Sequence, residues 1–248
     1  MIYGKTGTEF TLMAACDEKY LIHHAKGFTA SAAIAKNNVH LHVTNPTERG
    51  HKYLEFLGAG YEILHPDGVF TTSYDTIDIS IYKRIEYLKT FYACNRFLVA
   101  ADVMQADMLL VDIDCFIMKH IDNIDADVGL FLRDEKYKEW NGEAGKVAAG
   151  VVYVNKNHKD FLEPVKEFID NNKKHWFVDQ VALKRAYEAF PTKRYHVFNN
   201  KFMDWDFKSN TVIWTGKGDR KTSNAIYTNK HKEFKNLFPI KDSEYFVS

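Results

Sequence analysis

Residues 108–117 read MLLVDIDCFI, an apolar run that ends on two carboxylates one residue apart. A short apolar run is typical of a buried strand, and side chains two positions apart in a strand point to the same face. We therefore expect Asp112 and Asp114 to point the same way, roughly 6 to 7 Å apart along an extended backbone. A hard cation such as Mg²⁺ or Mn²⁺ binds one or two carboxylates and completes its shell with water and phosphate oxygens. The pair predicts a metal site that handles a phosphorylated substrate.

Composition favours a soluble globular protein and excludes several classes. The chain has 248 residues, of which 46% are hydrophobic, and its 33 basic residues equal its 33 acidic ones. This balance argues against a nucleic-acid partner. The three cysteines are far apart, which argues against a disulfide framework or a cysteine zinc site and favours the reducing cytoplasm. No stretch approaches the roughly 20 apolar residues of a membrane span, so we expect no transmembrane segment.

The pattern along the chain alternates strands with helices. We expect strands at residues 10–16, 39–43, 61–64, 108–112, 128–132 and 150–154, with later candidates at 195–198 and 211–214. We expect helices at residues 20–36, 47–57, 83–104, 160–172 and 179–190. This alternation predicts an α/β fold in one domain, residues 1–248, with a mostly parallel central sheet flanked by helices and ligands at the carboxyl ends of its strands. Residues 65–80 are expected to be turn-like, residues 133–146 to form a loop that could act as a lid, and residues 191–248 to form an irregular tail.

Six segments carry a further signal through their order. They are AACDEKYL at 14–21, YACNRFL at 92–98, LLVDIDCFI at 109–117, AAGVVYVN at 148–155, FVDQVAL at 177–183 and WTGKGDRK at 214–221. Together they resemble the nucleotide-sugar glycosyltransferases of the GT-A fold, most of all the glycogenin and lipopolysaccharide galactosyltransferase family (family eight). The resemblance runs from about residue 10 to residue 221, and it rests on the order of the motifs.

The resemblance implies roles for the acidic residues and for one glutamine. Asp114 would be a metal ligand, and Asp112 would contact the metal or the ribose. Asp17 would meet the base, although an aspartate before a helix is also a common N-cap. Asp179 and Gln180 would line the donor-sugar face as catalytic residues, with an N-cap as the other reading of Asp179.

The resemblance also assigns the basic and glycine residues. Arg96 would reach the diphosphate or the donor sugar, since a planar guanidinium suits phosphate oxygens. Gly216, Lys217 and Lys221 match a C-terminal segment that folds over the phosphates, so that the tail would close the nucleotide site. Of the tryptophans, Trp140 and Trp214 are the two whose rings we would test as sugar platforms.

Three positions depart from the family pattern. Ile213 stands where the family has the histidine that completes the metal shell, so a third protein ligand has to come from elsewhere. Ala148 replaces a sugar-contacting asparagine, and Val181 replaces the second aspartate of Asp-Gln-Asp. These departures affect the metal shell and the sugar contacts.

The activity implied by the resemblance is transfer of a hexose from a nucleotide-diphosphate sugar, a UDP-sugar, to an unknown acceptor, with Mn²⁺ or Mg²⁺ as the cofactor. It implies retention at the anomeric carbon, while the residues themselves leave the stereochemistry open. One alternative is a haloacid-dehalogenase-type phosphohydrolase with Asp112 as its nucleophile, although Phe116 replaces a small or β-branched residue there. Another is a catalytically silent module that binds nucleotide sugars, which is consistent with Ile213 and Ala148.

Overall fold

The structure is a computed structural model that describes residues 1–82, 84–133, 142–172, 175–216 and 218–241. A mixed sheet lies at the centre of the molecule. Within these residues its strand order is β1-β4-β3-β2-β5-β8-β7-β9. The strands are β1 (Ile2–Tyr3), β4 (Phe70–Asp75), β3 (Asn38–Thr44), β2 (Thr11–Asp17), β5 (Met108–Val111), β8 (Val147–Val154), β7 (Val128–Leu132) and β9 (Tyr195–Phe198). Strands β4, β3, β2 and β5 run parallel, and β8 runs antiparallel to both β5 and β7. The mostly parallel central sheet is confirmed.

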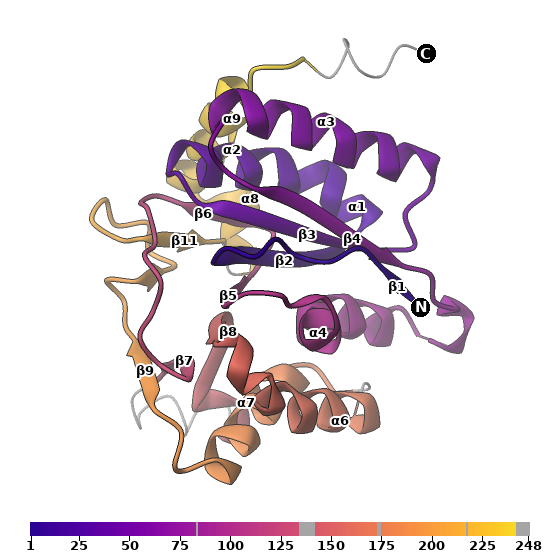
Figure 1. Ribbon diagram of the computed structural model, residues 1–248, viewed down its shortest axis with the longest axis vertical. Helices are drawn as coiled ribbons and strands as arrows, with labels where there is room; N and C mark the ends of the chain where they lie inside the picture. Colours follow the sequence, from indigo (N-terminus) through magenta and orange to yellow (C-terminus); the bar gives the residue numbers. More distant parts are fainter. Residues whose placement is uncertain (83, 134–141, 173–174, 217, 242–248) are drawn as a thin grey trace.

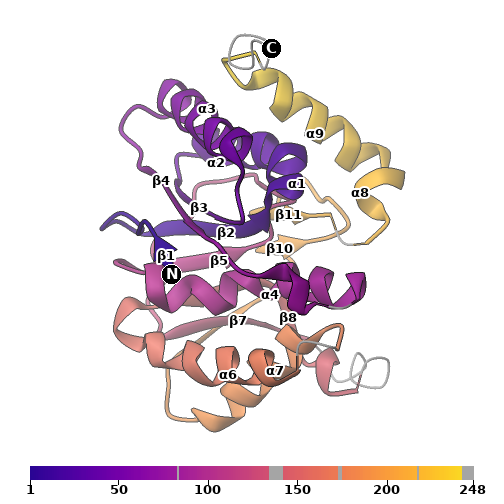
Figure 2. The ribbon, with the colours of Figure 1, turned by 90° about the vertical axis from the view of Figure 1, so that its right-hand side faces the viewer.

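Helices cover both faces of this sheet, as Figure 1 and Figure 2 show. One face carries α2 (Lys26–Ile34), α3 (Glu48–Leu64) and α9 (Ala225–Leu237), and the other carries α4 (Ile85–Val103), α6 (Leu162–Asn172) and α7 (Val178–Ala189). The shorter turns are α1 (Glu18–Tyr20), η1 (Leu21–Ala25), η2 (Ile79–Ile81), η4 (Gly142–Gly145), η5 (Lys156–Phe161) and α8 (Arg220–Ser223). Because helices lie on both sides, β2 and β5 are apolar and almost wholly buried.

A second, small sheet joins segments that are far apart in the sequence. It consists of β10 (Met203–Asp204), β11 (Ile213–Thr215) and β6 (Cys115–Ile117), in that order. The antiparallel pairing of β11 with β6 places Thr215 opposite Cys115. Since β6 directly follows Asp112 and Asp114, this sheet brings the segment after β11 next to the two carboxylates.

The prediction of a strand at residues 61–64 is wrong, because these residues form the last turn of α3. The buried Tyr61 side chain donates its hydroxyl hydrogen to the carbonyl oxygen of Asn37 at 2.8 Å, so the apolar stripe of the helix continues to its end. Gly60 lies near the end of the same helix. A Cβ at that position would collide with the ring of Phe238, so the glycine allows a close approach of the C-terminal segment.

The longest strand missing from the prediction is β4, which lies in the stretch expected to be turn-like. Its inward face is polar, so it lacks the apolar alternation that indicates a strand. Its side chains bind two buried histidines of β3 instead. The His40 ring bonds Thr71 Oγ1 and Ser73 Oγ, both at 2.8 Å, and the His42 ring bonds the same Ser73 oxygen at 2.8 Å.

This polar layer predicts acid sensitivity. Burial, helped by nearby His42, lowers the pKa of His40 from 6.5 to about 3. Below about pH 6.5 the unfolded chain therefore protonates His40, while the folded chain keeps this side chain neutral. The stability that is present above that pH is lost as the pH falls toward 3. When the pH is lowered from 7 to 5, we expect protonation of His40 in the unfolded chain to lower the unfolding free energy by about 2 kcal/mol. Urea unfolding at both pH values should give a smaller loss for His40→Gln than for the wild type, and equal losses would contradict the prediction.

In the described part of residues 191–248, β9 confirms the strand expected at 195–198, and β11 overlaps the one expected at 211–214. The expectation of an otherwise irregular tail is wrong, because this part also contains β10, α8 and α9. Helix α9 packs against α2, as both ribbon views show. Its Tyr227 ring stacks on Phe116 with centroids 4.9 Å apart. The helix therefore tethers the C-terminal region to the strand that follows the acidic pair. Most of the expected loop at 133–146 lies outside the described residues, and residues 142–145 form η4.

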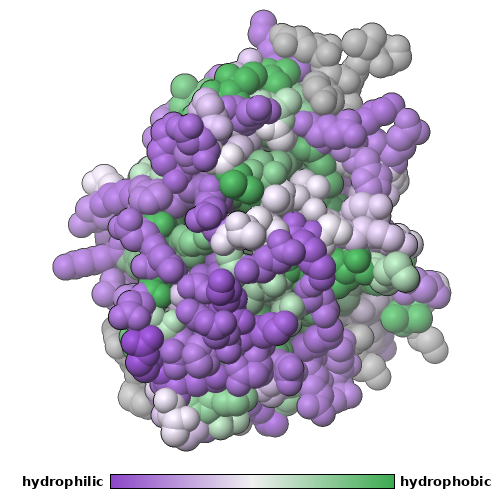
Figure 3. Space-filling model, viewed as in Figure 1, coloured by the Kyte–Doolittle hydropathy of each residue, from purple (hydrophilic) through white to green (hydrophobic). Residues whose placement is uncertain are grey.

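One face of the molecule is mainly hydrophilic. On the face drawn in Figure 3, hydrophilic side chains cover most of the surface and apolar ones occupy small separate areas. The exposed large apolar side chains include Ile81, Ile85 and Trp176. Among the helices of the described ranges, none combines the length and the apolar character that crossing a membrane requires.

Candidate active site

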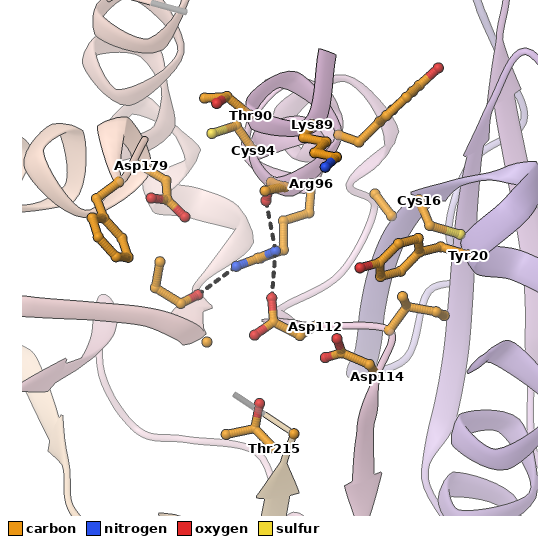
Figure 4. Close-up of a pocket in the computed structure, with 18 of the residues that line it drawn as sticks. Cys16, Tyr20, Lys89, Thr90, Cys94, Arg96, Asp112, Asp114, Asp179 and Thr215 are labelled. Atoms are coloured by element: carbon orange, nitrogen blue, oxygen red, sulfur yellow. Dashed lines mark hydrogen bonds and ion pairs between the residues drawn. The ribbon is translucent and has the colours of Figure 1, made fainter. Parts of the chain in front are cut away.

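A cavity of about 510 Å³ opens where β2 and β5 end. Its walls are the end of β2, one side of α4, the acidic segment, the start of β8, the first turn of α7 and the segment after β11 (Figure 4). The cavity brings together eight of the predicted site residues, namely Asp17, Arg96, Asp112, Asp114, Asp179, Gln180, Gly216 and Lys221. Lys217 lies outside the described residues. The parts of the chain that carry the motifs thus converge on one site.

The two carboxylates lie in a turn, so the prediction of an extended backbone through them is wrong. β5 ends at Val111, and the Cys115 N–H donates to the carbonyl oxygen of Asp112 at 3.2 Å. Both side chains still face the cavity (Figure 4). The Asp112 side chain is 33% exposed and that of Asp114 is 8% exposed. The turn therefore delivers the shared orientation that the strand was expected to provide.

Arg96 holds Asp112. One guanidinium nitrogen lies 2.8 Å from Asp112 Oδ1, and the same nitrogen donates to the carbonyl oxygen of Ala93 at 2.9 Å. The other terminal nitrogen donates to the carbonyl oxygen of Ala149 at 2.8 Å (Figure 4). The side chain is only 5% exposed and also lies over the Phe97 ring, with 4.6 Å from its central carbon to the ring centroid. Arg96 is thus a preorganised cation at the floor of the cavity.

Lys221 holds Asp114. Its ammonium group forms an ion pair with Asp114 Oδ2 and lies 5.5 Å from the centroid of the Tyr20 ring. Burial works against the charge, yet Asp114 raises the pKa of Lys221, so the lysine is a cation here. Gly216 makes this possible, because a Cβ there would come within 2.8 Å of both Lys221 and the Tyr227 ring. Each carboxylate of the pair therefore has its own basic partner from a distant part of the chain.

The remaining predicted residues are placed as follows. Asp17 lines the cavity and also caps α1, because its Oδ1 accepts from the Tyr20 N–H at 2.8 Å. Burial raises the pKa of Asp179, although Arg96 opposes this shift. Gln180 is buried in the first turn of α7, and its Oε1 accepts from the guanidinium of Arg133 at 2.9 Å. Whether these groups contact a donor stays a prediction.

Two of the positions that depart from the family pattern, Ile213 and Ala148, lie where the departures affect the site. Ile213 is fully buried in β11 and pairs with Ile117 of β6, so an aliphatic side chain occupies the expected histidine position. Within the described ranges, no three His, Cys, Asp or Glu side chains gather as a metal-binding group. Ala148 lines the cavity and presents only a methyl group to it. Among the described residues, Asp112 and Asp114 therefore remain the candidate protein ligands.

Sequence reasoning missed Arg133 and the aromatic side chains around the cavity. Arg133 follows a strand in an ordinary polar loop, so no motif distinguished it. Trp176, 59% exposed, and Trp205 line the cavity. Trp214 is buried and donates its ring N–H to the carbonyl oxygen of Lys208 at 2.7 Å, so it packs below the site, while Trp140 lies outside the described residues.

Comparison with known proteins gives a result through structure only. No protein-family model matches the sequence, and no curated protein matches it either. Among solved structures, the galactosyltransferase LgtC in complex with donor and acceptor sugar analogs matches with TM-score 0.61 and 16% identity, over 95% of this chain and 98% of that one. The chain has the GT-A fold.

Two other glycosyltransferases share this GT-A fold. The apo structure of the bifunctional WbbM matches with TM-score 0.61 and 11% identity, over 94% of this chain and 50% of that one. GlyE of Streptococcus pneumoniae TIGR4 matches with TM-score 0.57 and 10% identity, over 96% and 63%. This chain thus spans about half of WbbM and under two thirds of GlyE. At sequence identities this low, the structural similarity establishes the fold alone. The activity has to be argued from the site.

Proposed function

We propose that the protein is a glycosyltransferase that moves a hexose from a nucleotide-diphosphate sugar, a UDP-sugar, to an acceptor hydroxyl in the cytoplasm. The observation that carries the proposal is the pairing of Asp112 with Arg96 and of Asp114 with Lys221 in one cavity of a GT-A fold. Two acids and two bases at one sheet edge form a site whose charges can be exchanged for those of a metal and a diphosphate. The fold shared with several glycosyltransferases supports the same assignment.

Within this proposal the cavity divides into three parts. The base lies near Asp17 and Tyr20, where an aromatic ring 41% exposed is available for stacking. The diphosphate lies between Arg96 and Lys221, and the segment from Gly216 closes over it. The sugar lies against the start of α7, where Asp179 and Gln180 line the wall. We also propose that the chain works as one domain whose C-terminal region closes the nucleotide site.

The carboxylates fit a hard divalent cation in their chemistry. Both Asp112 and Asp114 offer oxygen atoms to one cavity, and Mg²⁺ or Mn²⁺ is held by one or two carboxylates together with phosphate and water oxygens. When bound, the ion would neutralise negative charge on the leaving diphosphate. Lys221 forms an ion pair with Asp114 in the structure. We therefore expect this lysine to leave the carboxylate and pair with a phosphate oxygen when the donor binds.

The proposed transfer replaces one bond of the anomeric carbon by another. The bond between the anomeric carbon and the phosphate oxygen breaks, and its electron pair stays on the diphosphate. The acceptor oxygen bonds to the anomeric carbon on the same face from which the phosphate leaves, which gives retention. Its proton passes to an oxygen of the departing phosphate. Arg96 stabilises the growing charge, and its three polar contacts hold it in place before the reaction.

A donor screen tests the proposal. Purified protein is incubated with UDP-glucose, UDP-galactose, UDP-N-acetylglucosamine or GDP-mannose, with Mn²⁺, with Mg²⁺ or with EDTA, and release of the nucleoside diphosphate is measured. We expect slow hydrolysis of at least one UDP-sugar that stops in EDTA. Nucleotide-sugar binding without turnover would favour the silent module. Hydrolysis of a simple phosphomonoester would favour the phosphohydrolase, for which Asp112 would first have to leave Arg96.

A further inference from the structure

Arg133 and Gln180 form a polar pair that none of the motifs indicates. Arg133 follows β7, and Gln180 belongs to the first turn of α7, 47 positions later in the chain. The guanidinium Nη1 donates to the amide Oε1 of Gln180 at 2.9 Å, and both residues line the cavity at its sugar end. Gln180 is only 7% exposed, so its amide meets little solvent. The contact therefore governs how this amide faces the cavity.

The backbone on both sides fixes the pair. The Arg133 N–H donates to the carbonyl oxygen of Lys146 at 2.8 Å, which ties the end of β7 to the start of β8. The Gln180 N–H donates to the carbonyl oxygen of Phe177 at 3.0 Å. Phe177 itself has φ of 66°, a left-handed conformation that is costly for a bulky side chain. Such an outlier persists where its surroundings enforce it, and here it opens the helix turn that presents Gln180.

We propose that Arg133 is a positioning residue that fixes which end of the Gln180 amide meets the donor sugar. A guanidinium has donors only, so it can pair only with the amide oxygen. That oxygen is then withheld from the anomeric carbon, and the NH₂ group is left to donate to an oxygen of the sugar or of the bond that breaks. Gln180 therefore acts as a hydrogen-bond donor and forms no bond to the sugar. This inference rests on the proposed function and names a residue that the function itself does not require.

Steady-state kinetics of donor hydrolysis test the inference with Arg133→Met, Arg133→Lys and Gln180→Glu. In Arg133→Met the amide is free to rotate, so we expect kcat to fall about 100-fold, as expected for a misplaced catalytic group. KM for the donor should rise by no more than the affinity that the sugar adds to that of UDP. Lysine can also donate to Oε1, so Arg133→Lys should recover part of kcat. Glutamate keeps the contact with Arg133 but lacks the NH₂ donors, so Gln180→Glu should lose as much as Arg133→Met.

Non-additivity separates positioning from a general structural effect. Because the two residues act as one unit, the double variant should be no worse than either single variant. Losses that multiply, or kcat within twofold of the wild type in Arg133→Met, would overturn the inference. Arg185→Met is the matched control, since Arg185 is an exposed arginine on α7, the helix that carries Gln180. This variant should leave kcat unchanged.

Binding distinguishes failure of this inference from failure of the proposed function. If the wild type turns over none of the donors, the proposed function fails on its own. Calorimetry with UDP-sugar and with UDP then still measures the affinity that the sugar adds through its contact with Gln180. The inference expects the extra affinity that the sugar confers to be lost in Arg133→Met. An equal increment in wild type and variant would reject it, as would the absence of any binding.

Discussion

Asp114→Asn is expected to lower metal-dependent donor turnover by a factor on the order of 10² to 10³, the range seen when one charge-stabilising group is removed from an active site. The carboxylate is 8% exposed and belongs to the acidic pair that faces the cavity, so its charge is poorly replaced by solvent. Asparagine keeps the shape but loses the negative charge that holds both Lys221 and a divalent ion. Release of UDP and binding of Mn²⁺, followed separately, should both decline.

The fold should survive this substitution. The contact from the Tyr227 hydroxyl, at 2.7 Å, goes to the backbone carbonyl of Asp114, which asparagine retains. Asp122→Asn is a matched control, because that side chain is 94% exposed on the surface. We expect the control to keep full turnover. Unchanged Mn²⁺-dependent turnover in Asp114→Asn would mean that the acidic pair does not hold the ion.

Arg96→Met is expected to reduce both stability and turnover. Removing one member of a buried ion pair leaves the other charge uncompensated, and with Asp112 still 33% exposed we expect a loss of roughly 3 kcal/mol of unfolding free energy. The variant also loses the hydrogen bonds to the Ala93 and Ala149 carbonyl oxygens. Turnover should fall together with stability, because the cation that pairs with Asp112 is gone. Urea unfolding and donor hydrolysis measure the two effects.

A surface ion pair provides the comparison. Arg194, which is 64% exposed, pairs with Asp125 at 3.1 Å, and such pairs contribute at most about 1 kcal/mol. Arg194→Met should therefore change the unfolding free energy far less than Arg96→Met and leave turnover intact. If both variants lost the same amount, the buried network around Arg96 would have no special role in stability. The double variant Arg96→Met with Asp112→Asn should recover part of the stability, since no uncompensated charge remains.

Several features of the site followed from local sequence. The apolar run before Asp112 predicted a buried strand at 108–112, and β5 occupies residues 108–111. The alternation of strands and helices predicted a sheet covered on both faces and ligands at one edge, which is where the cavity lies. Such patterns are readable because burial on one or both faces imposes a period on the apolar residues.

Other features were not readable from local sequence. The β4 strand has a polar inner face because His40 and His42, on the neighbouring strand, supply partners for Thr71 and Ser73. Gly60 lies inside α3 and makes room for Phe238, 178 positions later. In both cases the reason for the residue type lies on a distant segment, which no local period reveals.

The sequence by itself determined the α/β class, the buried strand and the presence of two acids after it, since each depends on neighbours along the chain. Only the tertiary structure decided which charge meets which, placing Arg96 on Asp112, Lys221 on Asp114 and Arg133 on Gln180. These pairs join residues 16 to 107 positions apart, and their formation depends on how helices and loops pack around one sheet edge. The local pattern thus indicated the acidic ligands, and packing assigned their partners, because ion pairs between distant residues leave no period in the sequence.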